Sequence, residues 1–306
     1  MLICWQKELL LSSGNFLSRK TSHKMEHKAT FILMGCFIAV TAFSQPVDCV
    51  RQDQVIFEKF TKFIEPYRPK STDSILQQTA EFFLHSPYVA GTLDKNNTER
   101  VVINLREFDC VTFVETVIAL ASAAASDDLS FDNFTSRIKQ IRYRNGVIDG
   151  FDSRLHYTSD WVYDNVEKKI LSATAQQLGG IRETKIIDFM TSHRSAYRAL
   201  KTDDEMLERI RIMENKINAR SGFYYLPKDK IASKEAGIPH MAMIAFTTSI
   251  KGLDTTHTGF AYKKDGKLTF IHASSAKNKV VIDEKTLSEY CKGQKSCTGI
   301  MVMPVR

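Results

Sequence analysis

The order of two hydrophobic patterns along the chain constrains its fold more than any other feature. Up to about residue 219 the apolar residues recur at helical spacing, whereas the last third holds short apolar runs separated by turns. We expect helices over residues 54–64, 74–84, 110–125, 131–142 and 203–219, strands over 241–247, 257–262, 268–272, 280–282 and 299–304, and an irregular stretch over 146–160. Helices followed by antiparallel strands predict an α+β fold, with an N-terminal helical part packed on one face of a C-terminal antiparallel sheet.

Residues 1–44 have the pattern of a secretory signal peptide. The uncharged run 30–43 follows Lys28 and ends at the small-x-small site Ala42-Phe43-Ser44. Met25 lies just before Lys28, so we expect it to be the true start and residues 1–24 to be a mis-called extension. The mature protein is then residues 45–306, expected as a single domain because no break in composition marks a second one.

Export has consequences for the membrane and for the cysteines. Leu33-Met34-Gly35-Cys36 resembles a lipoprotein attachment box, but it falls inside the hydrophobic run. We therefore favour a soluble periplasmic or extracellular protein over one lipidated at Cys36, and the run is too short to be a stable membrane span. In an oxidising compartment Cys291 and Cys297 form either a disulfide or two separate thiols, and this choice stays open.

Composition and charge exclude several classes of protein. With 43% apolar and 25% charged residues, the chain is neither disordered, collagen-like nor a polytopic membrane protein. Residues 1–44 carry +3 of the net charge of +7, and no Lys/Arg run follows, so nucleic-acid binding is not expected. No phosphate-binding loop, dinucleotide fingerprint, His-Glu-x-x-His motif or Cys-x-x-Cys pair occurs, so we expect no cofactor and no metal. The oligomeric state stays open.

Cys110 is a candidate nucleophile because it opens a predicted helix. Asp109, a good N-cap residue, precedes it, and Phe113, Val117 and Ala121 begin an apolar stripe behind it. In the first helical turn the unpaired backbone N–H groups and the helix dipole favour a thiolate, and the same N–H groups can hold an oxyanion. The alternative is a structural cysteine that happens to begin a helix.

Two histidines are expected on one face of a hairpin, where one can serve as the base for this thiol. Asp265-Gly266 is a strong two-residue turn signal between the fourth-last and third-last predicted runs. The pairing that this turn imposes sets His272 opposite Gly259 and makes His257 and His272 diagonal neighbours on one face. The pattern favours a relay in which one histidine is the base and a second polar group orients it. The alternatives are structural histidines or metal ligands.

These residues resemble a known family. Asp109-Cys110 opening a helix, His257-Thr258-Gly259-Phe260 on a strand and Ile271-His272-Ala273 on the next strand resemble the NlpC-type papain-like cysteine hydrolases of the bacterial cell wall. The resemblance implies a papain-like core, with Cys110 as nucleophile, His257 as base and His272 as the residue that orients the base. One departure is that the strand before His257 begins Met241-Ala242, where these families usually have Gly-Asp.

Further segments resemble one branch of this family more closely. Around the motif of residues 108–115, the segments 87–93, 142–146 and 153–161 resemble a group long filed as a domain of unknown function and regarded as N-acetylmuramoyl-L-alanine amidases. The resemblance implies cleavage between N-acetylmuramic acid and L-alanine in muropeptides, anhydro forms included. It also suggests Tyr88 and Thr92 as residues of the substrate groove.

The polar and aromatic stretch 153–161 supplies the other candidate substrate-binding residues. Arg154 is suited to a bidentate pair with a peptide carboxylate, and His156 either binds substrate or caps a turn. Tyr157 and Trp161 form either an apolar wall against the substrate or anchors between the loop and the core. Two rival functions stay open: an endopeptidase that cuts between D-glutamate and a diamino acid of the stem peptide, and a muropeptide-binding module without catalysis.

Overall fold

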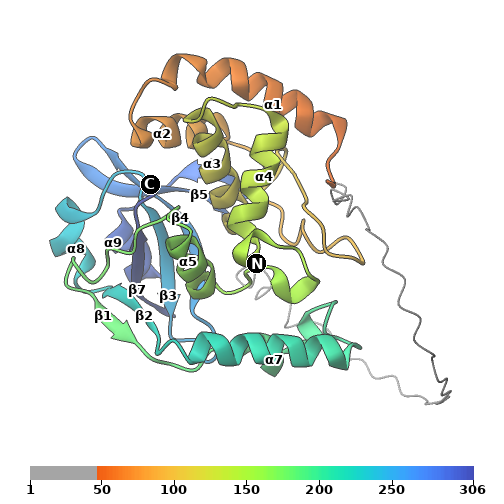
Figure 1. Ribbon diagram of the computed structural model, residues 1–306. Coiled ribbons are helices and arrows are strands. Elements are labelled where there is room, and N and C mark those ends of the chain that lie inside the picture. The colour runs from red at the N-terminus through yellow and green to blue at the C-terminus, as the bar shows by residue number, and fades with distance from the viewer. Residues whose placement is uncertain (1–46) are drawn as a thin grey trace, which may run out of the picture.

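The computed structural model describes residues 47–306 (Figure 1). The signal peptide predicted over residues 1–44, the start at Met25 and the lipidation alternative at Cys36 all lie outside these described residues. The helices are α1 (Arg51–Ile64), α2 (Thr72–Phe82), α3 (Cys110–Ala124), α4 (Phe131–Arg142), α5 (Thr158–Glu167), α6 (Phe189–Ser192), α7 (Asp204–Asn218), α8 (Ile231–Lys234) and α9 (Leu287–Gly293). From residue 47 onward, no helix combines the length and the apolar character that crossing a bilayer requires.

The strands form one antiparallel sheet. They are β1 (Ile181–Glu183), β2 (Phe223–Pro227), β3 (Met243–Thr248), β4 (Thr255–Lys264), β5 (Lys267–Ser274), β6 (Lys279–Ile282) and β7 (Cys297–Met303). Their order is β1-β2-β7-β3-β4-β5-β6, so β4 and β5 lie side by side near one end of the sheet. The last five strands match the predicted runs. The sequence patterns missed β1 and β2 because both are short, and the alternation in β2 stops at Pro227.

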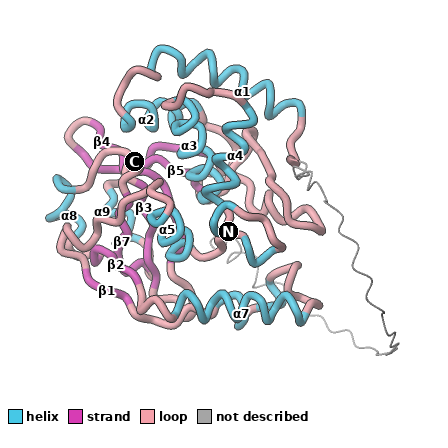
Figure 2. Tube along the Cα trace, viewed as in Figure 1, coloured by secondary structure: helices cyan, strands magenta, loops and turns pink. Residues whose placement is uncertain are grey.

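Both faces of the sheet are covered, so the expectation of helices on one face was incomplete. Met243, Ala245 and Phe260 face the larger core, which also holds the buried side chains of α1–α5. Ile244 and Phe246 face the opposite way, toward α8 and α9. Figure 2 shows the strands gathered on one side of the molecule and α1–α4 on the other. The fold is α+β.

Helix α3 lies at the centre of the larger core. Thirteen of its fifteen residues are buried, so it is apolar almost all round rather than along a single stripe. It packs against α2 and α4 and against strands β4 and β5. The ring of Phe113 in α3 meets that of Phe260 in β4 with 6.2 Å between centroids. The helix that begins at Cys110 is therefore held against the histidine-bearing hairpin.

The stretch 146–160 is only partly irregular. It contains a 3-10 turn over Phe151–Ser153, but helix α5 begins at Thr158, so the prediction was wrong for Thr158–Asp160. The backbone N–H of Ser159 donates to the carboxylate of Asp254 at 2.6 Å. This carboxylate caps the N-terminus of α5 from a distant loop, and a local pattern does not reveal such a cap.

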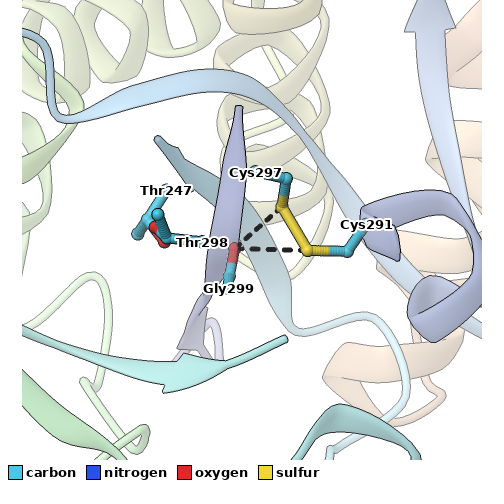
Figure 3. The surroundings of a disulfide bond; sticks show 5 residues. All are labelled: Thr247, Cys291, Cys297, Thr298 and Gly299. Atoms are coloured by element: carbon cyan, nitrogen blue, oxygen red, sulfur yellow. Dashed lines mark hydrogen bonds between the residues drawn. A yellow bond between two sulfur atoms is a disulfide. The ribbon is translucent and has the colours of Figure 1, made fainter. Parts of the chain in front are cut away.

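A disulfide links α9 to β7. Cys291 and Cys297 are bonded, and the carbonyl oxygen of Gly299 lies 3.9 Å and 3.5 Å from their respective sulfurs (Figure 3). Of the two alternatives that the sequence left open for these cysteines, the structure has the disulfide. Both cysteines are buried between the sheet and helices α8 and α9, on the side of the sheet that carries Phe246.

Candidate active site

Cys110 is the first residue of α3, as predicted, and it is 1% exposed. The N-cap is Asp109, whose Oδ1 accepts hydrogen bonds from the backbone N–H groups of Val111 (3.1 Å) and Thr112 (2.8 Å). Thr112 Oγ1 in turn accepts the N–H of Asp109 at 2.9 Å, which completes a reciprocal cap. The position at the positive end of a helix favours a thiolate. The expectation that the first-turn N–H groups hold an oxyanion is wrong for Val111 and Thr112, because the cap already uses them.

The β4–β5 hairpin has the predicted register. Phe260 pairs with Ile271 and Lys264 with Lys267, around a turn at Asp265 (φ 51°) and Gly266 (φ 74°). The register between β3 and β4 shifts by one residue just before His257, as in a β-bulge. Bulges turn side chains to new directions beside functional sites.

The two histidines of this hairpin contact each other directly. Nε2 of His257 lies 2.6 Å from Nδ1 of His272. Burial lowers the pKa of His257 well below its ordinary value, and the nearby His272 lowers it further. Burial also lowers the pKa of His272, against the opposing effect of Asp283. Both rings are therefore neutral at pH 7, which is the state that a general base requires.

Two residues that sequence reasoning missed complete this cluster. Asp283 Oδ2 lies 3.3 Å from Nε2 of His272. The ring of Tyr290 in α9 lies 6.0 Å from the ring of His257 and 5.9 Å from that of His272. No motif marks either residue, since Asp283 is one acid after a strand and Tyr290 one aromatic in a short helix.

The pKa of Tyr290 depends on charges from both the histidine cluster and the cysteine. Burial raises the pKa of Tyr290, and the negative charges of Asp283 and Cys110 raise it further. Tyr290 therefore lies within electrostatic reach of the N-terminus of α3 as well as of the histidines. Helix α3, which begins at Cys110, and the hairpin that carries His257 and His272 thus act on the same tyrosine. A thiol, a neutral base and an orienting group are the side chains that acyl transfer by a cysteine requires.

Tyr88 and Thr92 lie on the segment that runs beside the start of α3. The backbone of Tyr88 pairs with that of Phe108, two residues before the cysteine, and its N–H donates to the carbonyl of Asn278 at 3.0 Å. Thr92 is 3% exposed and lines a small cavity together with Thr112 and Arg142.

Tyr157 and Trp161 are both buried, and both make hydrogen bonds inside the protein. The hydroxyl of Tyr157 donates to Glu214 Oε1 at 2.7 Å and accepts the N–H of Met190 at 2.8 Å. Trp161 Nε1 donates to Glu115 Oε1 at 3.2 Å. Trp161 also lines a small cavity together with Val111 and Thr258.

Arg154 and His156 line a cavity formed by other segments than those that carry the histidine pair. This cavity has a volume of about 790 Å³ and is enclosed by parts of the segments 91–100, 150–156 and 196–206. The guanidinium of Arg154 is buried and paired with Asp94 at 2.6 Å and Glu99 at 3.5 Å, so these carboxylates occupy the place foreseen for a peptide carboxylate. His156 Nε2 contacts the carbonyl of Phe151 at 2.7 Å, and burial lowers its pKa well below the ordinary value.

This cavity shares one lining residue, His156, with a second and much smaller cavity. His156 also lines a small cavity with Val111 and Thr258, the neighbours of Cys110 and His257. On the other wall, Gly91 and Leu93 continue the segment that passes Phe108. Within residues 47–306, no group of three or more His, Cys, Asp and Glu side chains has an arrangement that suits a metal ion.

Comparisons with known proteins give a consistent picture. A family model described as AmiA-like, N-acetylmuramoyl-L-alanine amidase-like, matches residues 78–300. The crystal structure of an N-acetylmuramoyl-L-alanine amidase from Bacteroides uniformis is 36% identical, covers 76% of this chain and 98% of that chain, and has a TM-score of 0.72. A structure described as a putative xylanase from Bacteroides fragilis is 36% identical, covers 74% and 99% of the two chains, and has a TM-score of 0.70.

A more distant structure shares the fold alone. It is a Legionella pneumophila protein assigned to the DUF1460 family model, 23% identical over 83% of this chain and 96% of that chain, with a TM-score of 0.61. No curated protein matches the chain.

Proposed function

Because the chain belongs to the AmiA-like, N-acetylmuramoyl-L-alanine amidase-like family, we propose that it is a cysteine-dependent amidase that cleaves the bond between N-acetylmuramic acid and L-alanine in muropeptides, anhydro forms included. The family and the similar structures make it a hydrolase of the cell-wall amidase kind. The observation that carries the finer proposal is the contact of 2.6 Å between His257 and His272, taken together with the place of Cys110 as the first residue of α3. The papain-like core of the NlpC type is part of the same proposal.

The proposed mechanism uses three side chains. His257 takes the proton of the Cys110 thiol, and the thiolate attacks the carbonyl carbon of the lactyl amide. The protonated His257 gives this proton to the departing amino group of L-alanine, so that the C–N bond breaks and a thioester forms. Water then attacks the thioester with His257 again as base, which releases the sugar acid and restores the thiol. His272 holds the ring of His257 in place throughout.

We assign the substrate to the cavity that His156 lines. Its volume of about 790 Å³ is within the range of small-molecule sites, and it shares His156 with the small cavity that Val111, the neighbour of Cys110, lines. In this proposal Tyr88 and His156 lie nearest the reacting amide, and Arg154 and Thr92 keep the walls in shape. Tyr157 and Trp161 support the segment from the core.

We also propose that residues 45–306 form one exported catalytic domain after removal of the signal peptide. The buried disulfide between Cys291 and Cys297 supports this, because such bonds persist in oxidising compartments such as the periplasm.

Other functions fit the site less well. A glycosidase, as the description of the Bacteroides fragilis protein suggests for that protein, needs two facing carboxylates, whereas Asp283 is the acid that contacts the histidine pair. A stem-peptide endopeptidase would use the same cysteine and differ in the bond that it cuts. A binding module would not require the buried contact between His257 and His272.

The test is mass spectrometry of purified muropeptides after incubation with residues 45–306, alongside Cys110→Ala and the matched control Cys49→Ala, which removes the other thiol. We expect free stem peptide and free sugar with the unaltered protein and with Cys49→Ala, and none with Cys110→Ala. A cut within the stem peptide would keep the mechanism and refute the bond assignment. Binding without turnover in all three proteins would refute the proposal that the protein is an enzyme.

A further inference from the structure

Asp283 follows β6 directly and presents its carboxylate to the histidine pair. Its Oδ2 lies 3.3 Å from Nε2 of His272, and its Oδ1 accepts a hydrogen bond of 2.9 Å from the backbone N–H of Lys285. The backbone N–H of Asp283 donates to the carbonyl of Phe270 at 2.9 Å, which fixes the residue beside β5. The His272 ring, which is 1% exposed, thus has a carboxylate at one nitrogen and His257 at the other.

The charge state of Asp283 decides which of these groups donates. Burial acts to raise its pKa, but the hydrogen bonds from His272 and from the backbone of Lys285 outweigh burial and lower it. The charge of Lys285 acts in the same direction, whereas Tyr290 faces the pair as a neutral phenol. Asp283 is therefore ionised at neutral pH, and an ionised carboxylate only accepts hydrogen bonds.

The proton positions then follow along the chain of contacts. Nε2 of His272 must carry a proton in order to donate to Asp283. A neutral imidazole has one N–H group, so Nδ1 of His272 is an acceptor. Nε2 of His257, 2.6 Å away, must therefore be the donor. This leaves the lone pair of His257 on Nδ1.

We propose that Asp283 is a positioning residue that sets the tautomers of His272 and His257 through two consecutive hydrogen bonds, so that Nδ1 of His257 accepts the Cys110 proton. The inference rests on the proposed role of His257 as the base. The opposite tautomers would place a proton on Nδ1 of His257, and that nitrogen would then have no lone pair for the thiol. When the thiol proton arrives, the resulting imidazolium donates through Nε2 to His272, and the charge of Asp283 lies one ring farther along.

The two simplest variants of Asp283 separate this role from a structural one. In Asp283→Asn the amide oxygen stays with the N–H of Lys285, so the NH₂ group faces Nε2 of His272 and enforces the wrong tautomers. Asp283→Ala leaves both tautomers accessible. We expect kcat for muropeptide cleavage to fall by about 100-fold or more in Asp283→Asn with KM unchanged, and to fall less in Asp283→Ala. A purely structural carboxylate predicts the reverse order, because Asn keeps the shape. Glu284→Gln, which removes one charge from the exposed neighbour, keeps the original rate.

A second readout needs no muropeptide and therefore separates this inference from the proposed function. In a Cys49→Ser background, alkylation of Cys110 by iodoacetamide is followed between pH 5 and 9. We expect Asp283→Asn to slow alkylation at pH 7 by about 10-fold and to move its midpoint to higher pH. Alkylation at the original rate would overturn the inference, even if the protein cleaves muropeptides. A slowed rate in a protein without amidase activity would support the inference and refute the function.

The tautomers can also be observed without any change to Asp283. Long-range proton–nitrogen NMR spectra of ¹⁵N-histidine-labelled protein, assigned with His257→Ala and His272→Ala, should show the proton of both rings on Nε2. A proton on Nδ1 of His272 would overturn the inference whether or not the Asp283 variants fold.

Discussion

At the scale of single residues, the site combines buried neutral histidines with an ionised acid. Burial lowers the pKa of His257, His272 and His156, whereas hydrogen bonds hold the pKa of Asp283 below its ordinary value. The environment thus keeps the histidines uncharged and the carboxylate that orients them charged at the same pH. The same burial makes the folded state sensitive to acid, because these histidines bind protons more readily in the unfolded chain than in the folded protein.

We predict that the free energy of unfolding falls as the pH is lowered from 7.5 to 5. A histidine whose pKa is lower in the folded state binds more protons when unfolded, so stability is lost below its ordinary pKa of about 6.5. Each such histidine contributes up to about 1.4 kcal/mol per pH unit. Urea unfolding at both pH values measures this, and His156→Asn should reduce the loss whereas the exposed His193→Asn should not. An equal loss in both variants would contradict the prediction.

At the scale of elements, the β4–β5 hairpin and helix α3 fix the geometry of the site. The sequence predicted the hairpin register because Asp265 and Gly266 adopt the positive φ values that a two-residue turn needs. The same register sets Gly259 against His272. A Cβ atom on Gly259 would lie 2.7 Å from the carbonyl oxygen of Ile271 and 2.9 Å from Cβ of His272.

We predict that Gly259→Ala lowers kcat by about 10-fold or more, because a displacement of β5 lengthens the contact between His257 and His272. Gly293→Ala is the matched control. A Cβ on Gly293 would meet only the flexible end of Lys285, at 4.0 Å, so activity and stability should change little. Steady-state kinetics together with thermal melts make the measurement. A variant at Gly259 that folds and keeps the original kcat would show that the hairpin tolerates the shift.

At the scale of the whole molecule, α9 packs on the face of the sheet that carries the two histidines. It carries Tyr290 next to Cys291, and the disulfide to Cys297 links it to β7, the neighbour of the central strand β3. Tyr290 packs on Phe246 and Phe270 with 4.9 Å and 4.6 Å between ring centroids. The position of the ring that borders both histidines therefore depends on a covalent link outside the site.

We predict that the double variant Cys291→Ala/Cys297→Ala loses about 2 kcal/mol of unfolding free energy, as expected for the closure of a short loop, and shows a raised KM. Urea unfolding and kinetics measure the two effects. Cys49→Ala, which removes a thiol outside the disulfide, is the control and should change neither. Unchanged stability in the double variant would contradict the structural role of the bond.

The sequence by itself determined the local elements: the helix that starts at Cys110 behind its Asp109 cap, the order of helices and strands, and the hairpin that sets His257 beside His272. These follow from hydrophobic periods, caps and turn residues, which act over a few positions along the chain. Only the tertiary structure decided the partners. It placed Asp283 and Tyr290 at the histidines, capped α5 with Asp254, paired Arg154 with Asp94 and buried Tyr157. Such contacts join residues far apart in sequence, and their formation depends on how whole elements pack, which no short pattern encodes.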